Sequence, residues 1–265
     1  MSQPNVCVIT SPGGNCDDDT FNAFERFGAD AEKIHISQLD SGERTLNGFQ
    51  ILALPGGFSY GDTIASGRIL GIEVQTRLGD QLNDFHDNGG LSIGICNGDQ
   101  VMTEIGLIPD GRVDPTKPKA ITLAHNLSGK FESRWVHLKV EPSKCLFFQP
   151  EDIGEVIELP VAHGEGRYVA ADSEAMFDRL QRNGQIVCRY AGEDGQPTTD
   201  YPANPNGSPY GIAGICDPSG RILGMMPHPE RFINRTHHPN WQRGQGQIQY
   251  GALIIKQMIK VAKGM

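Results

Sequence analysis

The stretch LSIGICNGDQ, residues 91–100, decides how the rest of this 265-residue chain is interpreted. Residues 91–95 form a short apolar run typical of a buried strand, and a helix is expected from about Asn97. Between them, Gly94 and Gly98 flank Cys96 in a Gly-x-Cys-x-Gly pattern. This is the thiol form of the nucleophile elbow, a sharp strand-to-helix turn that holds its central residue in a strained conformation. The pattern predicts that Cys96 lies at a helix N-terminus, where the helix dipole lowers the pKa of a thiol.

Strand and helix patterns alternate on the N-terminal side of this turn. Strands are expected at residues 6–10, 31–36 and 50–54, and helices at 20–27 and 69–87. Such alternation is typical of a parallel sheet with helices on both faces.

The second half of the chain has a more β-like pattern. Strands are expected at residues 122–125, 134–140, 156–161 and 186–190, and a terminal helix at 250–261. The turn Asp217-Pro218-Ser219-Gly220 separates apolar runs at 211–216 and 221–226, which predicts a hairpin, and residues 198–209 are expected to form an exposed loop. We therefore predict one α/β domain over residues 1–265: an open, mostly parallel sheet flanked by helices, with additional β-hairpins in the second half.

Composition excludes several classes of protein. The formal net charge of −9 argues against nucleic acid as the main partner, because phosphate binding needs a basic surface. No apolar run approaches the roughly 18–20 residues that span a bilayer, and the N-terminus has no signal-peptide pattern, so no membrane association and a cytoplasmic location are expected. The six cysteines are scattered and form no CxxC pair, which favours free thiols and predicts no metal site.

A thiol nucleophile needs a base and an acid that orients it, and both occur near the end of the chain. In MMPHPE, residues 225–230, His228 stands between two prolines that restrict its backbone, and Glu230 follows two residues later. We predict that His228 is the base and that Glu230 fixes its tautomer and stabilises its charged form. The simpler alternative is a loop histidine that pairs with a surface glutamate by chance.

The segment Pro55-Gly56-Gly57 follows a predicted strand and offers backbone N–H donors. Acyl chemistry generates an oxyanion, and backbone N–H groups can stabilise it. We predict that the N–H groups of Gly57 and Asn97 form this oxyanion hole. A glycine turn without a ligand is the alternative.

The tripeptide Gly-Ile-Cys occurs a second time, at residues 214–216. Asp217 and Pro218 follow it, so the second glycine of the elbow is missing, and Cys216 is predicted to be structural. Cys96 could in principle be the same kind of small buried apolar residue, because Gly-x-Cys-x-Gly alone is a weak pattern.

Taken together, these segments resemble the class I (triad) glutamine amidotransferases. The resemblance implies a flavodoxin-like sheet and a triad of Cys96, His228 and Glu230. It implies that Cys96 attacks the side-chain amide of glutamine, that His228 protonates the departing ammonia, and that water then hydrolyses the γ-glutamyl thioester. Gln100, in the elbow helix, is expected to bind the substrate amino acid.

Longer motifs narrow the resemblance to one family of such glutaminases, the subunits of phosphoribosylformylglycinamidine synthases in purine biosynthesis. The motifs are PGGFSYGD at 55–62, CNG-x-Q at 96–100, AHGEGRY at 162–168 and MMPHPER at 225–231. This resemblance implies that ammonia passes to an ATP-dependent synthetase subunit, often bridged by a third small subunit. ATP and Mg²⁺ are then expected on the synthetase, and no cofactor is expected in this chain.

Some residues leave questions open. Asp99 lies three residues after Cys96, where the family carries a larger apolar or neutral side chain, and its carboxylate could raise the pKa of the thiol. His163 and Glu165 could form a second acid–base pair, although a glycine-rich setting favours a structural role. The adjacent His237 and His238 suggest a solvated or partner-facing loop more than a metal site.

Two other functions are compatible with the same residues. One is an elbow-cysteine hydrolase or peptidase of related fold, against which the terminal His-Pro-Glu argues. The other is a catalytically idle binding subunit, which Asp99 keeps open despite the intact triad.

Overall fold

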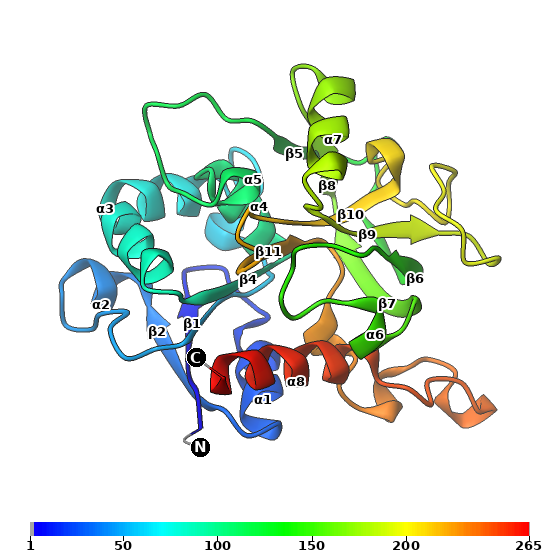
Figure 1. Cartoon of the computed structure of the whole chain (residues 1–265), viewed down its shortest axis with the longest axis horizontal. Helices are drawn as coiled ribbons and strands as arrows, with labels where there is room; N and C mark the ends of the chain where they lie inside the picture. The colour runs from blue at the N-terminus through cyan, green and yellow to red at the C-terminus, as the bar shows by residue number, and fades with distance from the viewer. Residues whose placement is uncertain (1–2, 265) are drawn as a thin grey trace.

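The computed structural model describes residues 3–264. Its centre is a nine-stranded sheet with the order β2-β1-β3-β4-β11-β10-β9-β6-β7, and β5 and β8 form a separate two-stranded sheet (Figure 1). The strands are β1 (Asn5–Thr10), β2 (Asp30–His35), β3 (Ile51–Leu54), β4 (Leu91–Ile95), β5 (Thr122–His125), β6 (Glu132–Val140), β7 (Val156–His163), β8 (Glu165–Val169), β9 (Ile186–Ala191), β10 (Ile212–Cys216) and β11 (Ile222–Met225).

The strands β2, β1, β3, β4 and β11 run parallel to one another. Their order is that of flavodoxin-like sheets, in which ligands bind beyond the carboxyl ends of the strands. Strands β3, β4 and β11 are buried along their whole length, which accounts for their continuous apolar runs. The predicted α/β class with its parallel sheet is confirmed.

The other half of the sheet is antiparallel. Strands β10 and β11 form the hairpin predicted around Asp217-Pro218, and β6 pairs with both β7 and β9. The predicted additional hairpins of the second half are therefore confirmed.

Helices cover both faces of the sheet (Figure 1). On one face lie α1 (Asp17–Arg26) and α8 (Tyr250–Lys263), and on the other lie α3 (Arg68–Asp87), α4 (Asn97–Glu104) and α5 (Leu107–Asp110). The remaining helices are α2 (Ile36–Asp40), α6 (Pro150–Ile153) and α7 (Ser173–Arg182), together with five short 3₁₀ turns among the described residues. One cluster of buried apolar residues runs along both halves of the sheet, from Val6 to Ala262.

Some predicted features are wrong in detail. Residues 198–209 are not an exposed loop throughout, because Asn204, Asn206 and Ser208 are buried, and the Asn206 side chain donates to the Gly166 carbonyl and the Tyr190 hydroxyl. These amide and hydroxyl groups form hydrogen bonds inside the protein, which lets a polar segment be buried.

The two adjacent histidines have different surroundings. His237 is exposed, whereas His238 is buried against the rings of Trp135 and Phe232 and contacts the Glu158 carboxylate. The prediction of a solvated loop is therefore wrong for His238. Strand β8 and helices α2 and α7 have no counterpart among the elements predicted from the sequence.

Among residues 3–264, no helix is both long and apolar enough to cross a membrane. The cytoplasmic location stays a prediction, as does the single domain.

Candidate active site

The predicted elbow is present between β4 and α4. Cys96 has φ +51° and ψ −102°, a backbone conformation that residues with side chains rarely adopt. Added Cβ atoms show why glycines flank it. A Cβ on Gly98 would lie 2.0 Å from the Leu54 carbonyl oxygen, and one on Gly94 would lie 2.8 Å from the Gly98 backbone. The turn therefore needs both glycines, because a helix start has to pass this close to two strand ends.

The thiol of Cys96 is buried, and its hydrogen-bond partner is the Ala162 carbonyl, 3.5 Å away at the end of β7. Burial raises the pKa of Cys96 well above its ordinary value, with smaller contributions in the same direction from Cys16 and Glu230. The Asn97 N–H opposes this shift by hydrogen bonding to the sulfur. The expectation of a thiol acidified by the helix dipole is therefore wrong for this state of the protein, because desolvation outweighs the helix N-terminus.

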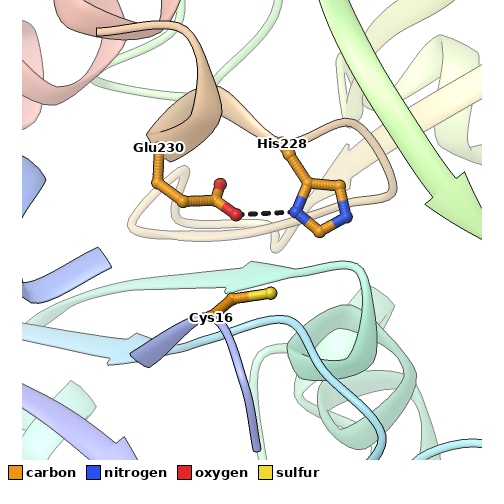
Figure 2. A group of neighbouring side chains, drawn as sticks. All are labelled: Cys16, His228 and Glu230. Carbon is orange, nitrogen blue, oxygen red and sulfur yellow. Dashed lines mark hydrogen bonds and ion pairs between the residues drawn. The ribbon is translucent and has the colours of Figure 1, made fainter. Parts of the chain in front are cut away.

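His228 and Glu230 form a buried pair just beyond the end of β11. The His228 Nδ1 lies 2.6 Å from the Glu230 Oε1, and Figure 2 shows the two side chains facing each other. The backbone N–H of His228 donates to the Pro160 carbonyl on β7. Within the described residues, the other two polar atoms of the pair, His228 Nε2 and Glu230 Oε2, have no hydrogen-bond partner.

The sheet brings Cys96 and His228 to the same edge. Strands β4 and β11 are parallel neighbours, with Ile95 opposite Met225, and the Cys96 N–H donates to the Met225 carbonyl. Both residues therefore follow the carboxyl ends of adjacent strands. The triad is only partly assembled. The histidine is bonded to Glu230, but the Cys96 thiol is directed to the Ala162 carbonyl and not to the histidine.

The predicted oxyanion loop lies against both the nucleophile helix and the base. Gly57 has φ +141° and pairs with Gly14, and a Cβ on Gly57 would lie 2.8 Å from the Asn15 nitrogen. On the other side of the loop, a Cβ on Gly56 would lie 2.8 Å from the His228 ring. Only glycines allow the loop to fit this closely between the base and residues 14–15.

The Asn97 side chain connects this loop to the elbow helix. Its Oδ1 accepts from the Ser59 N–H, and its Nδ2 donates to Gln100 Oε1. The Gln100 Nε2 donates to the Glu165 carbonyl on β8. Both ends of the Gln100 amide are thus bonded within the protein, and its predicted binding of substrate stays a prediction.

The Asp99 side chain is bonded to residues other than the nucleophile. Its buried carboxylate accepts hydrogen bonds from the hydroxyls of Tyr168 and Thr103. Burial raises the pKa of Asp99 to about 7, and these two hydrogen bonds lower it by less. Asp99 is not among the main groups that shift the pKa of Cys96, which burial dominates.

His163 and Glu165 do not pair with each other. The His163 Nδ1 contacts Asn126 Oδ1, and burial, followed by the neighbouring His228, lowers the pKa of His163 to about 3. Glu165 accepts from the Ser66 N–H. The structural role favoured from the sequence fits these contacts.

One residue beside the site was not identified from the sequence. Cys16, at the N-terminal end of α1, lies against Gly56 and His228, and Arg231 donates to its sulfur at 2.9 Å (Figure 2). The only signal was its position in Gly13-Gly14-Asn15-Cys16, a loop without a recognisable catalytic pattern.

Comparison with known proteins agrees with this geometry. The family of CobB/CobQ-like glutamine amidotransferase domains matches residues 3–260, and the chain belongs to the glutamine amidotransferases.

Within this family, the chain is 45% identical over 265 residues to the phosphoribosylformylglycinamidine synthase subunit PurQ of Dehalococcoides mccartyi, and the match covers 99% of both chains. It is 36% identical to part of the phosphoribosylformylglycinamidine synthase of Homo sapiens; that match covers 87% of this chain and 18% of the human protein. Among solved structures, PurLQS from Thermotoga maritima contains a chain with 29% identity and a TM-score of 0.73, covering 98% of this chain and 99% of that one.

Proposed function

We propose that this chain is the glutaminase subunit of a phosphoribosylformylglycinamidine synthase. It hydrolyses glutamine to glutamate and ammonia, and the ammonia goes to an ATP-dependent synthetase subunit that aminates formylglycinamide ribonucleotide. Full-length identity of 45% to a PurQ subunit supports the assignment to this assembly. The observation that carries the reaction is the strained Cys96 at the same sheet edge as the buried His228–Glu230 pair.

The chemistry begins with a protonated thiol, because burial raises the pKa of Cys96. Among residues 3–264, His228 Nε2 has no hydrogen-bond partner and can accept the thiol proton, while Glu230 Oε1 holds Nδ1. The sulfur then forms a bond to the side-chain carbonyl carbon of glutamine. His228 returns the proton to the departing nitrogen, which leaves as ammonia.

The second half of the reaction releases glutamate. A water molecule attacks the thioester carbonyl and gives a proton to His228, and the carbon–sulfur bond breaks. The proton then passes to the Cys96 sulfur, which restores the thiol. For these steps the thiol has to turn from the Ala162 carbonyl toward His228. Catalytic hydrogen bonds are often long without substrate and shorten when substrate binds.

The negative oxygen that forms in both steps needs donors. We assign this role to the backbone N–H groups of Gly57 and Asn97. The Asn97 N–H is already at the sulfur, and Gly57 belongs to the loop that Asn97 holds through Ser59. Gln100 lies one helical turn from Cys96 and is the candidate for contact with the amino-acid part of glutamine.

The partners follow from the same assignment. A synthetase subunit receives the ammonia, a small third subunit bridges the two, and ATP and Mg²⁺ belong to the synthetase. This chain itself needs no cofactor for the steps above, because the thiol, imidazole and backbone donors supply all of the chemistry.

Ammonia release from glutamine tests the proposal. It is measured for the isolated chain and for the chain with its cognate synthetase, ATP and formylglycinamide ribonucleotide. Release that increases in the full assembly supports the proposal. Cleavage of peptides without ammonia release would assign the chain to the elbow-cysteine hydrolases, and no release even in the assembly would make it an idle binding subunit.

A further inference from the structure

A second thiol lies beside the catalytic pair. The Cys16 Sγ, a ring nitrogen of His228 and a carboxylate oxygen of Glu230 all lie within 4.8 Å of one another, and all three residues are buried. In Figure 2 the Cys16 side chain lies below the His228–Glu230 pair, with its sulfur toward the ring. The reaction proposed above does not use Cys16.

The donor set matches a soft or borderline divalent cation. Thiolate, imidazole and carboxylate are the side-chain ligands that Zn²⁺ binds, usually with four-coordinate geometry, whereas Mg²⁺ prefers oxygen ligands and water. Within the described part of the chain, the Glu230 carboxylate also has an oxygen left without a partner. Glu230 is 1% exposed, and among residues 3–264 its Oε2 is one of the buried side-chain atoms with no hydrogen-bond partner.

The charges around the cluster are compatible with a cation. Arg231 is the nearest positive group, with its Nη2 2.9 Å from the Cys16 sulfur and its Nε 3.8 Å from Glu230 Oε1. Asp19 lies 3.6 Å from Arg231 on the solvent side. Once the thiol proton has left, Cys16, Glu230 and Asp19 carry three negative charges against one positive charge, which balances a divalent ion.

We propose that Cys16, His228 and Glu230 form an inhibitory site for Zn²⁺ or a similar thiol-binding divalent cation, with a water molecule as the fourth ligand. Zinc bonds of about 2.0–2.3 Å place tetrahedral ligands roughly 3.3–3.8 Å apart. The cation therefore has to separate His228 Nδ1 from Glu230 Oε1, now at 2.6 Å, and draw Cys16 inward. The metal replaces the hydrogen bond that orients the base. The Nδ1 proton of His228 moves to Nε2, and the thiol proton of Cys16 is released to solvent.

Metal binding by this chain does not depend on the proposed function, whereas inhibition does. The first measurement is therefore spectroscopic. Co²⁺ is added to the full chain as a probe, and a thiolate-to-cobalt charge-transfer band is expected for wild type. The band is expected to persist in Cys96→Ser and to be lost in Cys16→Ser.

Cys216→Ser is the matched control, because Cys216 is also a buried free thiol but lies in β10, outside this cluster. It is expected to keep the band. A band that disappears in Cys96→Ser and persists in Cys16→Ser would overturn the proposal, because the metal would then be held by the nucleophile.

The second measurement is Zn²⁺ inhibition of glutamine hydrolysis by the complete assembly. Wild type is expected to lose activity with added Zn²⁺ and to regain it with EDTA, and Cys16→Ser is expected to need at least ten times more Zn²⁺ for the same loss. Equal sensitivity of the two proteins would refute inhibition through Cys16. If the band is present in wild type and lost in Cys16→Ser but the wild-type assembly has no glutaminase activity, the metal site stands and the proposed function is refuted instead.

Discussion

The tripeptide Gly-Ile-Cys occurs twice in this chain, and the two copies have different structures. At residues 94–96 it ends a parallel strand, and Cys96 adopts φ +51° at the start of α4. At residues 214–216 it lies inside β10, in the antiparallel hairpin with β11. Both cysteines are buried free thiols, so neither the tripeptide itself nor burial distinguishes the nucleophile from the structural residue.

The residues that follow each copy account for the difference. After Cys96, the helix begins so close to Leu54 that a Cβ added to Gly98 would lie 2.0 Å from the Leu54 carbonyl oxygen. Glycine at this position therefore lets the helix start. In the hairpin, Asp217 accepts from the N–H groups of Ser219 and Ile222, which closes a turn instead. A reactive cysteine is therefore defined by the turn after it and by the strand edge to which that turn belongs.

The largest expected effect separates the two thiols directly. Cys96→Ala is expected to lower glutamine-dependent synthesis by about 10⁴-fold or more, the scale of losing a nucleophile in other hydrolytic triads. Synthesis from free ammonia is expected to stay near wild type, because the synthetase chemistry is separate. Steady-state rates with each nitrogen source, measured on the reconstituted assembly, provide the test.

Cys216→Ala is the control for this substitution and is expected to keep glutamine-dependent activity within about twofold of wild type. Equal loss in both variants would mean that the two Gly-Ile-Cys copies differ in backbone only and not in chemistry. Loss of ammonia-dependent synthesis in Cys96→Ala would contradict the division of roles between the subunits.

The next effect concerns the His228–Glu230 pair beside Cys96. His228→Ala is expected to be nearly as severe as Cys96→Ala, because the thiol of Cys96 is protonated at rest and needs a base. Glu230→Gln is expected to cost about ten- to a hundredfold less than the loss of the nucleophile, since an orienting residue contributes less than the base. The rate at which a glutamine-mimicking chloroketone alkylates Cys96 distinguishes them, and a Glu230→Gln rate equal to that of His228→Ala would reject this ranking.

Much of the site could be predicted because its signals are local. The strand at 91–95, the turn glycines and the two-residue spacing of His228 and Glu230 depend on short stretches of chain, and the structure reproduces the strand bounds and the pair. The hairpin at 217–220 is equally local.

The errors arise where distant segments meet. The raised pKa of Cys96 comes from burial that includes the end of β7, and no local pattern reports that contact. Cys16 lies beside the base although it is far away in the sequence. Arg231, which donates to the Cys16 sulfur, follows it by 215 residues. The polar loop around Asn206 can be buried because the Gly166 carbonyl and the Tyr190 hydroxyl, from other segments, accept hydrogen bonds from the Asn206 side chain.

A smaller effect tests the glycines that precede the two cysteines. A Cβ on Gly94 would lie 2.8 Å from the Gly98 backbone, whereas one on Gly214 would lie 3.1 Å from the Cys188 sulfur and 3.3 Å from the Met225 Cβ. Backbone cannot move aside as side chains can. Gly94→Ala is therefore expected to lower the free energy of unfolding by about 1–3 kcal/mol, and Gly214→Ala to change it by less than about 1 kcal/mol.

Urea unfolding of the two variants, read by circular dichroism, measures both values. Glutaminase activity is expected to fall in Gly94→Ala and to stay near wild type in Gly214→Ala. If both variants lose the same stability, the close approach at the elbow is not what distinguishes the two tripeptides.

The smallest effect on catalysis is expected at Asp99, in the elbow helix. Its carboxylate is held by Tyr168 and Thr103, and an added Cβ on Gly224 of β11 would lie 2.1 Å from the Asp99 Oδ1, which shows how closely β11 packs on it. Asp99→Asn is therefore expected to leave glutamine hydrolysis within about twofold of wild type, because this side chain is not among the main groups that shift the pKa of Cys96.

The same substitution is expected to change the pH dependence of stability. Burial raises the pKa of Asp99 from 3.8 to about 7 in the folded protein. Below pH 3.8 the group is protonated in both states and costs nothing, whereas above pH 7 it is ionised in both and the folded state bears the desolvation cost. The wild type should therefore lose stability relative to Asp99→Asn as the pH rises from about 4 to 7, by at most roughly 4 kcal/mol at 1.36 kcal/mol per pKa unit. Urea midpoints at pH 5, 6, 7 and 8 measure this difference in stability. If the difference between the two proteins stays constant with pH, the folded protein does not raise the pKa of Asp99, and its charge carries no desolvation cost in the elbow helix.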